Sequence, residues 1–524
     1  MTESGHMRSP KWLWLFGFGT LLLVLLPVVG LWLAYREPPG LFGAPPLSMD
    51  RIWPLLGRSL ALSFLVGLIS LLAGTWLAFA ETRTQYVGRR ILSFVSLLAL
   101  ATPSYVIATI VREQLAPQST LGAAFATSGT FTGFWPAVLV LSVACTPYVH
   151  LLSAAALRRC PVAEEESARA LGASTWRVCT TIIAPRLRPT WAFALVLVSL
   201  YVVSDFGAVA VLDCEVLTWE LYKARDGREA IAIGFGLLGV VIPLLAAVRL
   251  LHGRTHQERS VSQREPALIP MSTAALCLTW LIHLIIIGVG VLLPALTLTG
   301  WLMDGLQHQF SFAPTLTPAM TTLLTAGVGA FMVVIAAGIV SWMSATMESK
   351  ASSAVENAVY VTSSLPGILV AVGILKLIIG LKREAPSDLW LHLETAGVFL
   401  LAGYTMRFLS QGYAAIKPSI LRLDAAQIEA ARSLGANSSR AFRSITLPAI
   451  KPSMLAAYAL VFLSIAKELP ITLMLIPLGH TTLAYRIFDG QQEASLPDVG
   501  LAGMTLLAIA FTLQILLNRW RGHV

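Results

Sequence analysis

The chain has 524 residues, of which 56% are hydrophobic and only 12% are charged, and its formal net charge is +9 at pH 7. A soluble domain of this length needs far more charge to cover its surface. The composition and the mean hydropathy of +0.73 therefore exclude a soluble globular protein.

Apolar runs recur along the chain, and each is about 20 residues long, enough to cross roughly 30 Å of hydrocarbon. We predict twelve membrane-spanning helices, at about 12–33, 57–80, 91–111, 134–156, 190–212, 230–251, 272–298, 319–343, 358–380, 393–415, 454–477 and 499–518. The sequence therefore predicts an all-α, polytopic protein embedded in a lipid bilayer.

The first apolar run has two interpretations. Arg8 and Lys11 precede it, as basic residues precede the core of a signal peptide. The run is longer than a typical signal core, and no small-x-small cleavage site follows it. We predict a retained first span, and a cleaved signal peptide is the alternative.

The basic residues are distributed by membrane side. With the N-terminus assigned to the cytoplasm, most of the 37 Lys and Arg residues fall in cytoplasmic segments. This positive-inside bias predicts that both termini are cytoplasmic. It also explains the net charge, so we expect no nucleic-acid partner.

The spans divide into six plus six around a polar stretch. We predict a first half at 1–255, an exposed cytoplasmic linker at 256–270 and a second half at 271–524. His252 ends the first half and His256 begins the linker, with helical metal-ligand spacing in a basic cytoplasmic stretch. We therefore expect no metal site there.

An internal duplication relates the halves. Pro103 in the third span corresponds to Pro366 in the ninth, and Asp205 in the fifth to Glu468 in the eleventh, both at an offset of 263 residues. Because each half has an even number of spans, both halves enter the membrane in the same orientation. We infer a parallel repeat about an axis along the membrane normal, in which the two prolines kink equivalent helices.

Two long cytoplasmic loops, at about 157–190 and 416–453, carry one motif at this same offset. Both copies contain an acidic residue, small residues, a glycine and a later proline: Glu166, Ala168, Gly172 and Pro185 in the first, and Glu429, Ala430, Ala431, Gly435 and Pro448 in the second.

Each copy is expected to form a short helix, at 162–171 and 424–434, because both segments are rich in Ala, Glu, Arg and Leu. Gly172 and Gly435 follow directly, where the backbone can turn left-handed without a side-chain clash. The small alanines would let each helix sit deep in a partner's groove, and the prolines stand where the chain turns back toward the membrane. The pattern predicts two docking elements for a cytoplasmic partner.

At these residues the chain resembles the inner-membrane permease component of bacterial ATP-driven importers of the ABC type, with departures at Ser167 and Ala184. The resemblance implies that the segments from Glu166 to Gly172 and from Glu429 to Gly435 are coupling helices. These helices would dock into a dimer of cytoplasmic ATPase subunits, and a periplasmic substrate-binding protein would deliver substrate to the outer face.

A narrower resemblance covers nearly the whole chain. The segments Ser204-Asp-Phe-Gly-Ala-Val, Lys467-Glu-Leu-Pro-Ile-Thr-Leu and Thr482-Leu-Ala-Tyr-Arg-Ile are similar to the fused permeases of ferric-iron uptake systems. This resemblance implies movement of ferric iron from periplasm to cytoplasm across the bacterial inner membrane. Related fused permeases serve thiamine, polyamines or phosphonates, and these substrates are the alternatives.

Asp205 and Glu468 stand about fifteen residues into their spans, past the midplane at roughly 1.5 Å per residue. An acid at this depth costs on the order of 3 kcal/mol, so it usually faces a cavity or a partner. In one interpretation the pair lines the route of a hard, highly charged cation. In the other, each carboxylate caps a broken helix near Gly207 or Pro470, or pairs with a base such as Lys467.

Arg407 lies close to the inner end of the tenth span, where we expect it to anchor the helix by reaching the interface.

The chain lacks a G-x-x-x-x-G-K-[ST] phosphate loop, an H-E-x-x-H motif and a nucleophile elbow. We therefore expect a transport subunit without catalytic residues, metal or cofactor, with ATP hydrolysis in a separate partner. A proton-driven secondary carrier with six plus six spans is the rival class. Its usual loop motif is matched only by Gly-Arg-Arg at the end of 81–90, and it leaves the paired docking motifs unexplained.

Overall fold

The structure is a computed structural model. It describes residues 11–22, 26–35, 49–124, 129–225, 229–255, 267–308, 313–347, 349–385 and 387–521. Within these ranges nearly all regular structure is helical, and eight helices are long and apolar enough to cross a membrane. The predicted all-α polytopic fold is confirmed. The predicted linker lies outside the described residues up to residue 266.

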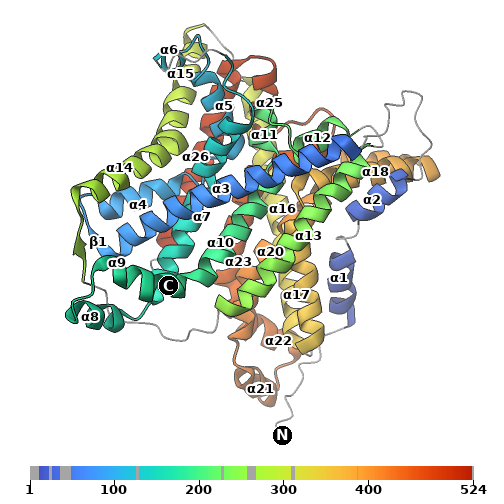
Figure 1. Ribbon diagram of the computed structural model, residues 1–524. Coiled ribbons are helices and arrows are strands. Elements are labelled where there is room, and N and C mark those ends of the chain that lie inside the picture. Colours follow the sequence, from blue (N-terminus) through green and yellow to red (C-terminus); the bar gives the residue numbers. More distant parts are fainter. Residues whose placement is uncertain are drawn as a thin grey trace.

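Four long helices form the body of each half (Figure 1). In the first half they are α3 (Met49–Arg83), α7 (Phe134–Arg159), α10 (Ala184–Ser204) and α13 (Glu229–Thr255). In the second half they are α16 (Ala313–Thr346), α20 (Val398–Leu421), α23 (Leu447–Ala466) and α26 (Leu496–Arg521). α3 packs on α7 and α10 in the first half, as α16 packs on α20 and α23 in the second. The same packing therefore occurs twice.

Several predicted spans are broken into two helices. The third span is α4 (Arg89–Leu98) followed by α5 (Ser104–Gln114), and the ninth is α17 (Ser349–Ser364) followed by α18 (Gly367–Glu384). Pro103 and Pro366 cap the starts of α5 and α18 with extended backbone. Because proline has no N–H and restricts the residue before it, these prolines end one helix and start the next instead of kinking one continuous helix.

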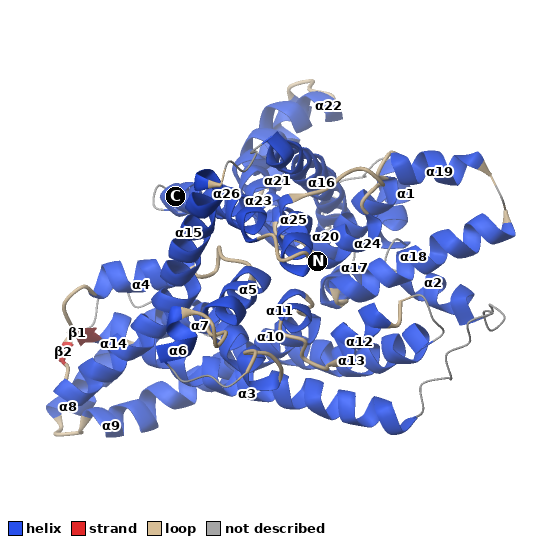
Figure 2. Cartoon of the chain, turned by 90° about the horizontal axis from the view of Figure 1, so that it is seen from above, coloured by secondary structure: helices blue, strands red, loops and turns tan. Residues whose placement is uncertain are grey.

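The first helices of each half pack on the other half (Figure 2). α1 (Lys11–Leu22) packs on α16, α2 (Leu26–Tyr35) packs on α18, and α14 (Thr273–Ile287) packs on α3, α4 and α7. α2 and α18 approach closely because they meet at glycines: a Cβ added to Gly30 would lie 1.8 Å from the carbonyl oxygen of Gly373. The halves are thus interlocked rather than placed side by side.

The π-helical segment η3 (Gly288–Leu292) and α15 (Leu293–Gln307) continue α14 as one helix long enough to cross a membrane, and α15 packs on α26. Shorter elements are β1 (Thr84–Gln85), α6 (Thr120–Ala124), α12 (Leu217–Lys223), β2 (Ile269–Pro270), α19 (Asp388–Thr395) and α25 (Leu483–Gln492). β1 and β2 form a two-stranded parallel pair that joins the end of α3 to the start of the second half.

Candidate functional site

The two docking loops have the same structure at an offset of 263 residues. The first consists of α8 (Val162–Ala170), α9 (Thr175–Val178) and the π-helical segment η2 (Cys179–Ile183), which leads into α10. The second consists of α21 (Ala425–Ser433), α22 (Ser438–Ala441) and η4 (Phe442–Thr446), which leads into α23. Both short helices lie where the sequence predicts them, on the lower side of the molecule (Figure 1).

The predicted glycines end these helices. Gly172 has φ +85° and Gly435 has φ +86°, and both are exposed. Beyond each glycine the chain closes back on its helix, where Ala173 N–H donates to Ala168 O and Ala436 N–H donates to Ala431 O, each at 3.0 Å. This geometry requires a left-handed residue, which glycine supplies without strain.

An exposed leucine stands at the tip of each loop, directly before the glycine. Leu171 is 88% exposed and Leu434 is 89% exposed. Of the other motif residues, Glu166 and Ala168 are half-buried in α8, and Ala430 is exposed in α21. The side chain of Glu429 lies outside the described residues. Both loops thus present an apolar tip at equivalent positions.

Pro185 and Pro448 occupy the first turns of α10 and α23. Each follows a π-helical segment in a continuous helix, at residues 175–204 and 442–466, and not a turn of the chain. A π-helical turn accommodates the missing proline N–H, because it shifts the hydrogen-bonding register by one residue.

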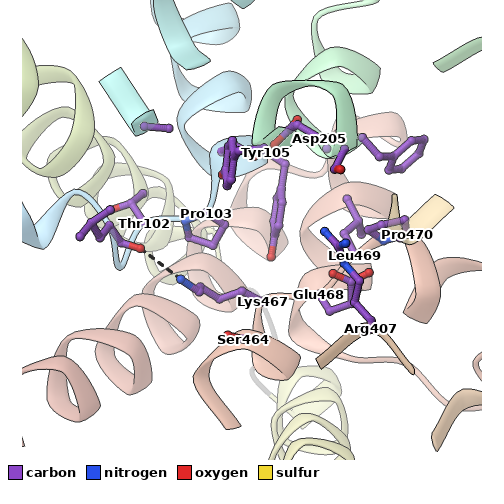
Figure 3. A pocket seen from close by; sticks show the side chains of 18 of the residues that line it. Thr102, Pro103, Tyr105, Asp205, Arg407, Ser464, Lys467, Glu468, Leu469 and Pro470 are labelled. Atoms are coloured by element: carbon purple, nitrogen blue, oxygen red, sulfur yellow. Dashed lines mark hydrogen bonds between the residues drawn. The ribbon is translucent and has the colours of Figure 1, made fainter. Parts of the chain in front are cut away.

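A cavity of about 260 Å³ lies between the two halves, where the predicted acids meet. Asp205 and Glu468 both line it, and most of its other positions are also related by the 263-residue offset. Three further pairs are Ala144 and Arg407, Tyr148 and Gln411, and Tyr201 and Ser464. The cavity is therefore placed on the axis of the internal repeat, and Figure 3 shows side chains from both halves converging on it.

Each acid also caps a short helix. Asp205 precedes α11 (Gly207–Val211), and its Oδ1 accepts a hydrogen bond of 2.9 Å from Ala208 N–H. Glu468 precedes α24 (Pro470–Leu475), and its Oε1 accepts a hydrogen bond of 3.3 Å from Ile471 N–H. Capping and lining of the cavity, separate interpretations of the sequence, thus coexist in one geometry.

In each half the acid contacts the residue that follows the proline of the other broken span, Ser104 in the first half and Gly367 in the second. Oγ of Ser104 donates to Oδ2 of Asp205 at 2.5 Å. The equivalent of Ser104 is Gly367, and a Cβ added there would lie 2.7 Å from Oε1 of Glu468. The longer glutamate thus takes up the space that the serine side chain fills in the first half.

Two cationic side chains line the cavity as well. Arg407 Nη1 donates to Leu365 O at 2.5 Å, and Lys467 Nζ donates across the halves to Leu100 O at 3.1 Å. Arg407 therefore contributes to the cavity wall, although the sequence led us to expect that it anchors its helix at the membrane interface. Lys467 directly precedes Glu468, so its place near the predicted acid could be expected from the sequence, whereas no sequence pattern indicates that Arg407 lines the cavity.

Aromatic side chains pack beyond the cavity, toward α12 and α25. Phe206 lines the cavity, and its ring lies 5.1 Å from that of Tyr222 and 6.2 Å from those of Trp219 and Phe488. Phe488 belongs to the second half, so this cluster joins the halves on the side away from the docking loops (Figure 1).

Comparison with known proteins assigns the family. The model of the binding-protein-dependent transport system inner membrane component matches this chain twice, at residues 48–261 and 335–521. Among the relatives is the Fe(3+)-transport system permease protein FbpB 2 of Haemophilus influenzae, 25% identical over 93% of this chain and 94% of that protein.

Other relatives match shorter stretches. The putative 2-aminoethylphosphonate transport system permease protein PhnV of Salmonella choleraesuis is 32% identical over 31% of this chain and 60% of that protein. The probable sulfate transport system permease protein of Chlorokybus atmophyticus is 25% identical over 48% of this chain and 93% of that protein. These relatives are named as permease proteins, which confirms a transport subunit and not an enzyme. The chain therefore belongs to the family of binding-protein-dependent inner-membrane transport components, as a fused permease with two copies of the family's domain.

Proposed function

We propose that this chain forms the membrane pathway of an ATP-driven importer that moves ferric iron from the periplasm to the cytoplasm. The observation that carries the proposal is the pair of carboxylates, Asp205 and Glu468, at equivalent positions of the cavity wall. Hard, highly charged cations prefer oxygen ligands, and carboxylates supply them. The Fe(3+)-transport relative, matched over 93% of this chain, supports the same substrate.

An oxyanion importer is the second candidate. Arg407 and Lys467 line the same cavity, and guanidinium and ammonium groups bind phosphonate and sulfate oxygens. The phosphonate and sulfate relatives favour this candidate, but they match 31% and 48% of the chain. The relative that matches almost the whole chain favours iron.

The partners follow from the docking loops. We propose that α8 and α21 dock into a dimer of cytoplasmic ATPase subunits, with Leu171 and Leu434 as apolar anchors, and that a substrate-binding protein docks on the opposite face. The halves at 1–255 and 271–524 would each carry one docking loop, and both termini would be cytoplasmic. ATP binding would then draw the two helices together and open the halves outward, and hydrolysis would reset them.

Uptake of radiolabelled ferric iron tests the substrate. Cells with and without the gene are compared, each with and without ATP depletion. We expect uptake that requires both the gene and ATP. Uptake of labelled phosphonate or sulfate, with no iron uptake, would replace the iron proposal by the oxyanion candidate and leave the family assignment in place.

A further inference from the structure

The two halves contribute different chemistry to equivalent positions of the cavity. Tyr148 and Tyr201 belong to the first half, and Gln411 and Ser464 replace them in the second. Phenols therefore come from one side only.

The cations come from the other side only. Arg407 and Lys467 belong to the second half, where the first has Ala144 and Ser204. The cavity thus has equivalent positions of different chemistry: phenols come from the first half, cations come from the second, and each half supplies one carboxylate.

The formal charges of the lining side chains cancel. The cavity is lined by two carboxylates, Asp205 and Glu468, and two cations, Arg407 and Lys467. Arg407 interacts electrostatically with Glu468, which leaves Asp205 and Lys467 as opposite charges from different halves. A neutral wall does not compensate a bare trivalent cation, and its carboxylates oppose a bare multivalent oxyanion.

Polar groups remain for a ligand within the described part of the chain. Tyr148 and Tyr201 line the cavity and are partly exposed, whereas the hydroxyl oxygens of Thr102 and Tyr105 are buried. Lys467 uses one ammonium proton for Leu100 O, and an ammonium group has three.

The cavity is half open, so its volume gives the scale of the part of a ligand that it encloses. Its volume of about 260 Å³ lies below the roughly 300–1,000 Å³ of pockets that enclose drug-sized molecules. It has room for several water-sized oxygens, which is the scale of a metal ion with a small oxyanion in its coordination shell.

From the charge balance, the polarity and the size, we infer that the cargo crosses this cavity as a complex of a multivalent cation and a small oxyanion, and not as a bare cation. The cation faces Asp205 and the first-half hydroxyl groups, and the oxyanion faces Lys467. This inference rests on the proposed function and specifies the form in which iron passes.

Double-label uptake tests the inference in proteoliposomes that contain the permease with its ATPase and binding protein. ⁵⁵Fe(III) is supplied with chloride as the only other anion, or with labelled phosphate, carbonate or citrate added singly. We expect at least one labelled oxyanion to enter with ⁵⁵Fe at a fixed ratio, and ⁵⁵Fe uptake to fall at least tenfold in chloride alone.

Equal ⁵⁵Fe uptake in chloride alone, with none of the three labels entering, would overturn the inference and leave the iron importer standing. Entry of a labelled oxyanion without ⁵⁵Fe in any medium would overturn both. The two failures are therefore distinguishable.

Lysine variants provide the matched control. Lys467→Met should reduce the joint uptake at least tenfold, and Lys467→Arg should restore most of it. Lys382→Met removes the same charge from an exposed ion pair with Glu394 outside the cavity and should leave uptake unchanged. Stimulation of the ATPase by the binding protein should persist in all three variants, which shows that they assemble. Normal joint uptake by Lys467→Met would contradict the inference.

Discussion

Arg83 and Glu165 form an ion pair that is almost fully buried, with Nη2 and Oε1 2.8 Å apart and side chains 1% and 2% exposed. Arg83 ends α3, Glu165 lies in α8, and the arginine also donates to Leu157 O near the end of α7 at 2.8 Å. The pair therefore ties the first docking helix to two membrane helices. The second half has Thr346 and Ile428 at the equivalent positions, which cannot form an ion pair.

A neighbouring contact also pairs an acid with a base in the first half and two hydroxyl groups in the second. Glu81 and His150 are joined by a hydrogen bond of 2.6 Å in the first half. Their equivalents, Ser344 and Tyr413, form a neutral hydrogen bond of 2.8 Å. Ionisable groups thus connect α3 and α7 near the first docking loop, and hydroxyl groups connect the equivalent α16 and α20 near the second. A separate ion pair at 3.1 Å, between Lys417 and Glu356, joins α20 to α17 in the second half.

Removing one partner of the buried pair should destabilise the protein strongly. We expect Glu165→Leu to cost about 3–5 kcal/mol, because the charge of Arg83 stays buried without compensation. Arg83→Leu should cost less, because Arg169 Nη2 lies 3.8 Å from Glu165 Oε2. The double variant, Arg83→Leu with Glu165→Leu, should cost less than Glu165→Leu alone. Thermal unfolding of the purified protein measures both effects. Arg186→Leu is the control, since its pair with Glu164 is 27% and 51% exposed and should contribute less than about 1 kcal/mol.

Gly435→Asp should uncouple transport while the protein stays in the membrane. The left-handed backbone at φ +86° makes a side chain cost about 1–2 kcal/mol, and the new carboxylate would stand on the exposed docking tip. Uptake and stimulation of the ATPase by the binding protein should both be lost. Gly397→Asp imposes a similar backbone penalty, at φ +71°, at the start of α20, which is the end of that helix opposite to the second docking loop. Normal uptake by the Gly435 variant would count against docking.

The double variant Asp205→Asn, Glu468→Gln separates the two roles of the acids. Amide oxygens still accept the backbone N–H bonds of α11 and α24, so the thermal unfolding temperature should change little. Both negative charges leave the cavity, so iron uptake should fall at least tenfold. If the assembled variant transports iron normally, the carboxylates are helix caps and not part of the pathway.

Gly367→Ser should impair uptake, because its Cβ would press on Oε1 of Glu468 at 2.7 Å and on Pro470 Cγ at 3.0 Å. The first half shows how to relieve this contact, since it has an aspartate and a glycine at the matching positions. Adding Glu468→Asp and Pro470→Gly should therefore restore uptake and the unfolding temperature. A triple variant no better than the single one would show that the halves do not share this geometry.

Reporter fusions after Arg521 test the topology. With a cytoplasmic C-terminus, a fluorescent protein fused there should fluoresce and alkaline phosphatase should be inactive. The opposite pattern would reverse the membrane orientation, and α8 and α21 would then face away from any cytoplasmic ATPase.

Local features of this protein follow from the sequence by itself. The length of the apolar runs predicts membrane-spanning helices. Gly172 and Gly435 end their helices because local backbone sterics require a left-handed residue there. The 263-residue repeat also predicts which positions are equivalent. These features depend on residues near one another in the chain, so no knowledge of packing is needed.

Only the tertiary structure decided which side chains share the cavity and how the halves interlock. Lys467 and Leu100 meet from different halves, and the exchange of α2 and α14 depends on how whole helices pack. An apolar helix has no water-facing side that marks its buried face, because lipid and protein interior favour similar residues. The rotation and partner of each helix are therefore set by packing across the membrane, which residue spacing does not encode.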